Sequence, residues 1–458
     1  MEKVKLTFAG GAKSPTGSNF LIEVGDKKFL VDCGLYQGSN KYCDECNLDA
    51  FIYDPKTIDG LFVTHGHLDH VGRIPKLVRE GFTGPIYSTP PTRDIGELIM
   101  LDSLNILKKE AEHNKTDLLY EEKDVINAMR AWHTMPYHEV LPIQTSAGIL
   151  SVRLLDAGHI LGSSMIEFTL NGKKLLLTGD LGNTPSPLLR DTEKIENIDY
   201  LVMESVYGDR NHENQKEKID IFKKAIQKIQ KTGGNMLIPA FSIERTQELL
   251  YYLNQMVESG ELPRIPVYVD SPLGINITKV YKKYEDYFNK NTDAIIKAGD
   301  DIFKFPGLIE TPSTEDSKAI NHDNRTKIII AGSGMSNGGR ILHHERAHLS
   351  DPRTVLLLVG YQAAGTLGRM LQDGHKQVHI MGEDVSVKAE VVMIGGFSAH
   401  KDSKHLVEFV ESSVATLKKV FIVLGEPKSS AFLAQRINEY YGLSVSVPDM
   451  GNTVELEM

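Results

Sequence analysis

Three histidines and one aspartate lie within six residues, in the segment His65-Gly66-His67-Leu68-Asp69-His70. The apolar run from Leu61 to Val63 directly before it predicts a buried strand. A tight turn after that strand can direct four side chains of the metal-ligating type into one cavity. Imidazole and carboxylate groups together suit zinc or a similar first-row metal. Two metal ions fit this segment better than one, because such close neighbours cannot all converge on a single ion.

Three further predicted strands lead to residues of the same chemical kind, namely His159, Asp180 and Glu204. Loops at a sheet edge are free to carry chemistry, while the strands fix their positions. A carboxylate at Asp180 can bridge two cations, and Gly179 before it lets the backbone approach closely. An aspartate after a strand is usually only a turn or a cap, but the accompanying histidines favour a ligand. Glu204 is placed to position or protonate a reacting group.

Asp32, after the predicted strand Phe29–Val31, has two interpretations. It accepts a hydrogen bond that fixes a ligand histidine, or it caps a turn.

Two Gly-rich loops, at 330–340 and 360–369, have the composition of an anion site. Backbone N–H groups at a helix start and an arginine would bind phosphate, and a plain tight turn is the alternative. A tyrosine in the second loop could stack on a base or be buried. The residues predicted to contact RNA or phosphate are Ser333, Gly334, Met335, Arg340, Tyr361 and Arg369.

The chain's length of 458 residues predicts two or three domains. It contains 41% hydrophobic and 24% charged residues, as soluble globular proteins do. No run approaches the ~20 apolar residues of a membrane span, and residues 1–5 lack a signal-peptide core, so we expect a cytoplasmic protein without a membrane partner. The net charge of −10 argues against a nonspecific nucleic-acid coat protein but not against a nuclease with a local basic channel. Cys33, Cys43 and Cys46 are too few for a disulfide framework, so we expect reduced thiols.

The order of predicted elements indicates two α/β units. Short β-like runs dominate residues 4–34, whereas strands and helices alternate between about 213 and 359. That alternation predicts a parallel sheet covered by helices, inserted into or packed on the first unit. Further strands at 376–381, 390–395 and 419–424 and a helix at 403–413 complete the chain.

These motifs resemble those of a known family. His65-x-His67-x-Asp69-His70, His159 and Asp180, with Asp32 as leading aspartate, look like the metal motifs of the metallo-β-lactamase superfamily. Several other segments are similar to its β-CASP branch, which acts on nucleic acids: Met203-Glu204-Ser205, Pro239-Ala240-Phe241 before Arg245-Thr246-Gln247-Glu248, Asp270-Ser271-Pro272-Leu273, Gly332-Ser333-Gly334-Met335 and Gly396-Phe397-Ser398-Ala399-His400. The resemblance covers nearly the whole chain and is closest to bacterial and archaeal relatives of the endonuclease subunit of the cleavage and polyadenylation specificity factor.

The resemblance implies an α/β fold, a four-layer αββα metallo-β-lactamase sandwich with an inserted α/β β-CASP domain. The expected domains are 1–205 and 370–458 for the sandwich and 206–369 for the insertion. It further implies two zinc ions, with manganese as an alternative. His65, His67 and His159 would hold one, Asp69 and His70 the other, and Asp180 would bridge.

Leu424 departs from the family pattern. The segment Ile422-Val423-Leu424-Gly425-Glu426 has leucine where the family carries a histidine ligand of the second metal. The expectation is a weaker second site, a different metal or an attenuated enzyme.

The function expected from the resemblance is hydrolysis of single-stranded RNA, mainly endonucleolytic, by a metal-activated water. Asp69 and Asp180 would act at the metal centre, and His400, supported by Glu204, would be the general acid. The alternatives are an RNA-binding scaffold with attenuated catalysis, motivated by Leu424, and a small-molecule hydrolase of the same superfamily. DNA cannot be separated from RNA by these motifs, and a homodimer is the assembly common among relatives.

Overall fold

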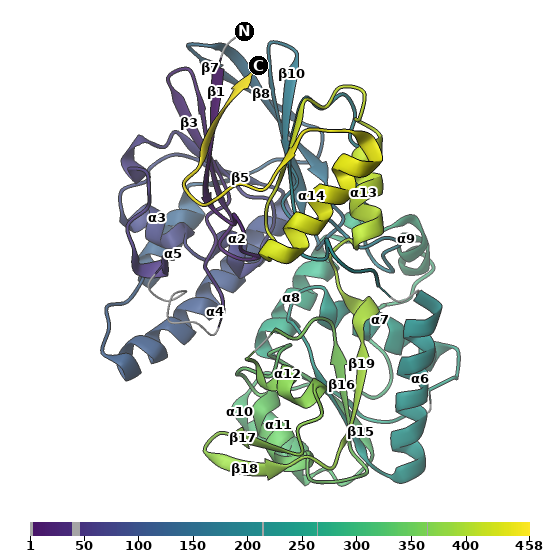
Figure 1. Cartoon of the computed structure of the whole chain (residues 1–458). Coiled ribbons are helices and arrows are strands. Elements are labelled where there is room, and N and C mark those ends of the chain that lie inside the picture. The colour runs from purple at the N-terminus through teal and green to yellow at the C-terminus, as the bar shows by residue number, and fades with distance from the viewer. Residues whose placement is uncertain (1–2, 39–45, 213–214, 263, 364) are drawn as a thin grey trace. The chain divides into compact units, whose positions relative to one another are not determined.

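The chain folds into two units, and the second lies within the sequence of the first. The first unit comprises residues 1–211 and 400–458, and the second comprises residues 212–399. The computed structural model describes residues 3–38, 46–212, 215–262, 264–363 and 365–458 (Figure 1). Cys43 therefore lies outside the described residues. Among the described helices, none is both long and apolar enough to cross a membrane.

The first unit contains two seven-stranded sheets. The order in one is β22 (Thr453–Glu457), β1 (Lys3–Gly10), β2 (Asn19–Val24), β3 (Lys27–Val31), β4 (Gly60–Phe62), β5 (Ile86–Ser88) and β6 (Trp132–Thr134). The order in the other is β21 (Val445–Ser446), β20 (Lys419–Ile422), β11 (Tyr200–Met203), β10 (Lys173–Leu177), β9 (Ser164–Leu170), β8 (Gly148–Asp156) and β7 (Val140–Thr145). Both sheets contain antiparallel and parallel neighbours. In the first sheet β1 and β2 are antiparallel whereas β3 and β4 are parallel. In the second sheet β9 and β10 are antiparallel whereas β10 and β11 are parallel.

A hydrophobic core fills the space between these two sheets. It joins side chains such as Phe8 and Phe62 of the first sheet to Phe168 and Val202 of the second. The rings of Phe62 and Phe168 meet edge to face with centroids 5.5 Å apart, an arrangement that aromatic quadrupoles favour. The alternation of inward and outward side chains in the strands makes this two-sided packing possible.

Helices cover the outer faces of the sandwich (Figure 1). Helices α13 (Ser403–Glu411) and α14 (Pro427–Tyr441) pack on the second sheet through a separate apolar cluster that includes Leu406 and Leu433. Helices α3 (Ile74–Arg79), α4 (Pro90–Asn114) and α5 (Glu122–Arg130) lie beside the first sheet. The predicted αββα sandwich is confirmed.

The second unit is built on a six-stranded parallel sheet, as predicted. Its order is β14 (Leu308–Glu310), β13 (Val267–Asp270), β15 (Lys327–Ala331), β12 (Asn235–Pro239), β16 (Val355–Val359) and β19 (Glu390–Ile394). The central strand β15 is buried along its whole length, as expected for a strand with helices on both faces. The helices are α6 (Gln215–Thr232), α7 (Arg245–Glu258), α8 (Pro272–Lys283), α9 (Lys290–Lys297), α10 (Thr314–Ala319), α11 (Ile341–His348) and α12 (Leu367–Gln372). A hairpin of β17 (Gln377–Ile380) and β18 (Glu383–Ser386) follows.

The domain boundary predicted at 369/370 needs correction, because it lies inside the second unit. Strand β19 pairs in parallel with β16, from Val355 opposite Glu390 to Val359 opposite Ile394. This pairing keeps the chain in the second unit up to residue 399. Periodicity alone assigned β19 correctly as a strand but could not tell which sheet it joins.

Candidate metal centre

The ends of three strands of the first unit, β4, β8 and β10, converge on one largely buried cluster. The ligand-type atoms of His65, His67, His159 and Asp180 all lie within 4.8 Å of one another. His67 Nδ1 is 3.0 Å from His65 Nε2 and 3.3 Å from His159 Nε2. Nε2 of His65 and of His159 lie 3.4 and 3.5 Å from Asp180 Oδ2. Three imidazole nitrogens that face each other beside a carboxylate are the donor set that zinc prefers.

Burial keeps two of these histidines in the ligating form. It lowers the pKa of His65 well below its ordinary value, and the neighbouring His70 lowers it further. Burial likewise lowers the pKa of His67 to about 3. A metal binds neutral imidazole, so no proton has to be displaced from these two rings.

Asp32 orients His70 toward the centre. His70 Nδ1 donates to Asp32 Oδ2 at 2.6 Å, and Asp32 also accepts from Thr64 N and from the Ser18 hydroxyl. Asp32 itself has φ +59°, a left-handed conformation that these contacts stabilise. Because Nδ1 carries the donated proton, the Nε2 lone pair of His70 is free to bind a cation.

His70 Nε2 is the strongest sign that a cation belongs here. This atom is buried and has no hydrogen-bond partner among the described residues. It lies 3.5 Å from Asp180 Oδ1 and 3.9 Å from Asp69 Oδ2. Burial opposes a charged imidazole, yet Asp180 and Asp32 outweigh it and raise the pKa of His70 well above its ordinary value. The same negative charge attracts a metal ion in place of the proton, so the residues present fit the metal.

The two carboxylates of the centre differ in their surroundings. Burial raises the pKa of Asp69 to about 6 despite the opposing effect of His70. For Asp180 burial acts in the same direction, but His70, His65 and His400 outweigh it and hold its pKa well below the ordinary value. Asp180 is therefore the anionic member of the cluster.

Glu204 and His400 form a second cluster that shares Asp180. Leu181 N donates to Glu204 Oε1 at 2.6 Å, and His400 Nδ1 lies 3.4 Å from the same oxygen and 3.9 Å from Asp180 Oδ2. A β-bridge between Gly182 and His400 fixes the backbone. Burial opposes charge on His400, but Glu204 and Asp180 outweigh it and raise the pKa of His400 to about 9.

Leu424 lies in the hydrophobic core between the two sheets. Its N–H donates to Gly11 O at 2.7 Å, its carbonyl accepts from Ser205 N, and its side chain is 1% exposed. A Cβ on Gly11 would lie 2.6 Å from Leu424 Cδ2, so the leucine fills the space against that glycine. The strand end that carries Leu424 thus adds packing and no ligand atom.

The two Gly-rich loops of the second unit meet each other. Gly368 N donates to Met335 O at 3.1 Å, and Gln362 Nε2 donates to Gly334 O at 3.1 Å. The backbone N–H groups of these loops were expected to be available to bind an anion. Those of Ser333 and Ser336 instead donate hydrogen bonds to carbonyls within the first loop. The structure thereby joins two segments that the sequence analysis treated separately.

Arg340, expected to contact phosphate, forms hydrogen bonds within the second unit. Its guanidinium donates to the buried carboxylate of Asp270 at 2.7 Å and to the carbonyls of Thr311 and Pro312. The side chain thus joins the end of β13 to the segment that follows β14. Arg369 pairs with Asp373 on the surface at 2.9 Å, a contact that costs little to break.

Thr64 and Ser163 support the centre and were missed by the sequence analysis. Thr64 Oγ1 donates to Asp32 and lies 3.1 and 3.2 Å from Nδ1 of His65 and of His70. Ser163 Oγ accepts from His159 N at 2.9 Å. The position of Thr64 directly before His65 is the one signal in the sequence that could have identified it. Ser163 gives no such signal, because serine and threonine are common throughout the sequence.

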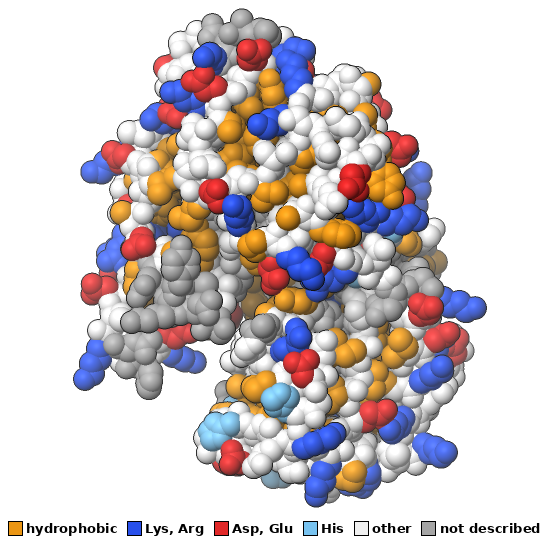
Figure 2. Space-filling model, viewed as in Figure 1, with side chains coloured by type: hydrophobic (Ala, Val, Ile, Leu, Met, Phe, Trp, Pro, Cys, Tyr) orange, Lys and Arg blue, Asp and Glu red, His pale blue; other side chains and the backbone are white. Residues whose placement is uncertain are grey.

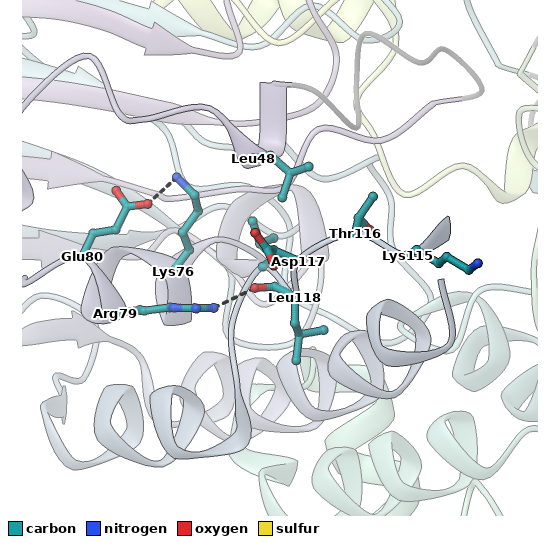
Figure 3. Close-up of a pocket in the computed structure, with 9 residues that line it drawn as sticks. Leu48, Lys76, Arg79, Glu80, Lys115, Thr116, Asp117 and Leu118 are labelled. Carbon is teal, nitrogen blue, oxygen red and sulfur yellow. Dashed lines mark hydrogen bonds and ion pairs between the residues drawn. The ribbon is translucent and has the colours of Figure 1, made fainter. Parts of the chain in front are cut away.

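A separate cavity of about 590 Å³ lies beside α3 (Figure 3). Two of its basic side chains are already engaged: Lys76 pairs with Glu80, and Arg79 donates to Leu118 O. None of the metal-centre residues lines it. The lining residues are Leu48, Lys76, Arg79, Glu80, Lys115, Thr116, Asp117, Leu118 and Leu119.

Comparison with known families accounts for almost the whole chain. Residues 16–226 match the metallo-beta-lactamase superfamily, residues 246–371 the Beta-Casp domain, and residues 384–448 the Zn-dependent metallo-hydrolase RNA specificity domain. Ribonuclease TTHA0252 of Thermus thermophilus is 36% identical over 97% of this chain and 98% of its own length. The chain belongs to the β-CASP branch of the metallo-β-lactamase superfamily. It is a metal-dependent hydrolase of the ribonuclease family, which confirms the enzyme class predicted from the sequence.

Two further relatives of this β-CASP protein come from archaea. Transcription termination factor FttA of Methanosarcina mazei is 31% identical over 95% of this chain and 69% of its own length. An RNase J-like protein of Methanocaldococcus jannaschii is 31% identical over 99% of this chain and 100% of its own length. A solved structure, a protein of unknown function from Enterococcus faecalis, has a TM-score of 0.56 at 14% identity, with 99% of this chain and 100% of that chain covered. That likeness shows the fold alone.

Proposed function

We propose that this chain cleaves single-stranded RNA internally. The observation that carries the proposal is the convergence of His65, His67, His159 and Asp180. Beside them lies His70 Nε2, which has no hydrogen-bond partner in the part of the chain that the structure describes, and the chain matches an RNA specificity domain. The matched domain names RNA as the substrate class. That the cleavage is internal is an expectation from the family resemblance described in the sequence analysis.

Each residue of the centre has a defined task in the proposal. The three histidines and Asp180 would hold one zinc ion, and Asp69, His70 and Asp180 a second. Bound zinc supplies Lewis acidity, which activates water near neutral pH and stabilises charge on phosphate oxygens. Asp32 fixes the His70 ring. His400, 23% exposed and anchored by Glu204, would donate a proton to the departing oxygen.

The second-unit loops are proposed to hold flanking phosphates. Ser333, Gly334, Met335, Tyr361 and Arg369 stay candidates for this contact, whereas Arg340 is committed to Asp270. A homodimer is a further expectation that a light-scattering measurement of molar mass can check.

The test is cleavage of a 5′-labelled single-stranded RNA by purified protein with zinc or manganese. Wild type should yield internal fragments, and Asp180→Asn should yield none. Asp384→Asn is the matched control, because that exposed aspartate pairs with the surface residue His379 on the β17–β18 hairpin. Release of single nucleotides instead of internal fragments would contradict the endonucleolytic assignment. A single-stranded DNA of the same sequence separates RNA from DNA specificity.

Leu424 motivates one alternative, an RNA-binding scaffold without catalysis. Histidine tolerates the left-handed backbone better than leucine does, and Leu424 has φ +50°. If wild type binds RNA without cutting it and Leu424→His restores cleavage, the scaffold is correct. If wild type cuts, the leucine is compatible with activity and the scaffold is excluded.

A further inference from the structure

Helix α14 exposes a row of aromatic and basic side chains. Phe432 and Tyr440 are 45% and 65% exposed, two helical turns apart. Arg436 lies between them, with its guanidinium carbon 6.0 Å from the Phe432 centroid and 5.4 Å from that of Tyr440. Lys428, one turn before Phe432, has an 89% exposed side chain. We call Lys428, Phe432, Arg436 and Tyr440 the α14 row.

The α14 row is not needed to pack the helix. The opposite face of α14 buries Leu433 and Ile437 in the cluster that covers the second sheet. Figure 2 shows hydrophobic and basic side chains next to one another over the region of α13 and α14. Exposed aromatic residues together with arginine are the composition typical of recognition surfaces.

The row begins at the same sheet edge as the metal centre. Strands β11 and β20 are parallel neighbours. Glu204 follows β11 and α14 follows β20, so both begin at the same edge of the sheet. Ser429 and Ser430, in the first turn of α14, bond to the carbonyl and hydroxyl of Ser205 at 2.7 and 2.8 Å. Further along, Arg436 Nη1 donates to Ser403 Oγ at 2.9 Å, and Ser403 lies three residues after His400. The row therefore leads away from the side that carries Glu204 and His400.

The spacing and order of the row suit a single nucleic-acid strand. Its members recur every four residues, about 6 Å apart along one face of the helix. Cations and rings alternate along the row, so each ring on which a base can stack has a cation beside it for a phosphate of the same strand. Rings stack on any base, and arginine adds cation–π attraction.

We propose that the α14 row binds the single-stranded RNA outside the cleavage site, as a second contact that extends from the metal centre. The inference rests on the proposed RNA function and deepens it. The match to the RNA specificity domain, residues 384–448, includes the whole of α14. RNA fits the row better than a protein partner does, because its cations alternate with its rings.

The test compares binding of RNAs of two lengths by fluorescence anisotropy. The variant is Phe432→Ala with Tyr440→Ala, and the matched control is Ile126→Ala with Ile149→Ala, which removes exposed apolar side chains elsewhere in the first unit. For an RNA of about 20 nucleotides, loss of two stacked bases should raise Kd about 30-fold or more. An RNA of about 6 nucleotides, which occupies only the cleavage site, should be bound and cut as by wild type.

Each result has one meaning. Equal Kd of variant and wild type for the long RNA overturns the inference and leaves the proposed function intact. Loss of a dimer in light scattering without a change in Kd overturns it in favour of an interface between copies. Wild type that neither binds nor cuts either RNA overturns both proposals. If the variant fails to fold, photo-cross-linking of wild type to a 4-thiouridine RNA decides: cross-links in the peptide with Phe432 or Tyr440 support the inference, and their absence overturns it.

Discussion

Asp180 of the first unit and Asp270 of the second are both buried aspartates at the end of a strand, yet they have opposite surroundings. Asp270 accepts hydrogen bonds on both oxygens, from Thr311 and Arg340 on one and from Ser317 and His344 on the other, at 2.6 to 2.9 Å. Those donors lower its pKa to about 2 against the effect of burial.

Asp180 is surrounded by imidazole nitrogens at longer range. Those of His65, His70 and His159 lie 3.4 to 3.5 Å from its oxygens, beyond the ~2.7–2.9 Å of a charge-assisted hydrogen bond. A carboxylate saturated by donors is structural, whereas one that faces ligand atoms across a gap is suited to a cation. The difference lies in the neighbours and not in the residue.

The largest expected effect follows from removing the charge of Asp180. Asp180→Asn should lower zinc content and reduce cleavage roughly 1000-fold or more, the scale of losing a central catalytic group. Metal content by mass spectrometry and RNA cleavage measure both, and full zinc content in the variant would contradict the assignment. Chelation of wild type should abolish cleavage in the same way and lower the melting temperature, because bound metal stabilises the folded state.

The matching change in the second unit should affect stability instead of metal content. Asp270→Asn leaves the Arg340 charge without its buried partner, which costs about 3–5 kcal/mol. Urea unfolding, followed by proteolysis within residues 212–399, measures the loss. Zinc content should stay at the wild-type level, and a large loss of zinc would show that the two aspartates are not as different as their contacts indicate.

A smaller effect is expected from Asp32, which contacts the ligand-type residue His70 but is no ligand itself. Asp32→Asn should weaken metal affinity about 10- to 100-fold, as the loss of an outer partner does. Competition with a chromophoric chelator measures the affinity. Ser18→Ala removes one donor to Asp32 and keeps the His70 contact, so it should have a milder effect; a milder effect of Asp32→Asn than of Ser18→Ala would exclude the orienting role.

The last prediction concerns Glu345, a buried acid of the second unit. Burial raises its pKa to about 8, and its Oε2 has no hydrogen-bond partner among the described residues. The unfolded chain releases this proton near pH 4.5, so wild-type stability falls as the pH rises from that value toward 8.

Glu345→Gln should remove this pH dependence. From pH 5 to pH 7 wild type should lose about 2.5 kcal/mol more stability than the variant. Urea unfolding at both pH values measures the difference, with Glu383→Gln, at an exposed surface acid, as the control. Equal pH dependence of wild type and Glu345→Gln would show that the group titrates normally.

Much of the centre could be predicted because its ligands follow strands. Apolar runs predicted β4, β10 and β11, and ligand-type residues directly after them predicted His65, Asp180 and Glu204. Helix α4, at Pro90–Asn114, was not predicted, and neither was the sheet that β19 joins, because β pairing depends on partners far away in the sequence.

The sequence by itself determined the donor types of the metal centre, the parallel sheet of the second unit and the membership of the family, because side-chain chemistry and strand or helix periods are local properties. Only the tertiary structure decided what each charged group does. It committed Arg340 to Asp270, left His70 Nε2 facing two carboxylates, placed Leu424 in the core and aligned four side chains of α14 on one exposed face. Hydrogen bonding and burial join residues hundreds of positions apart, so the contacts that decide a role become visible only after the chain has folded.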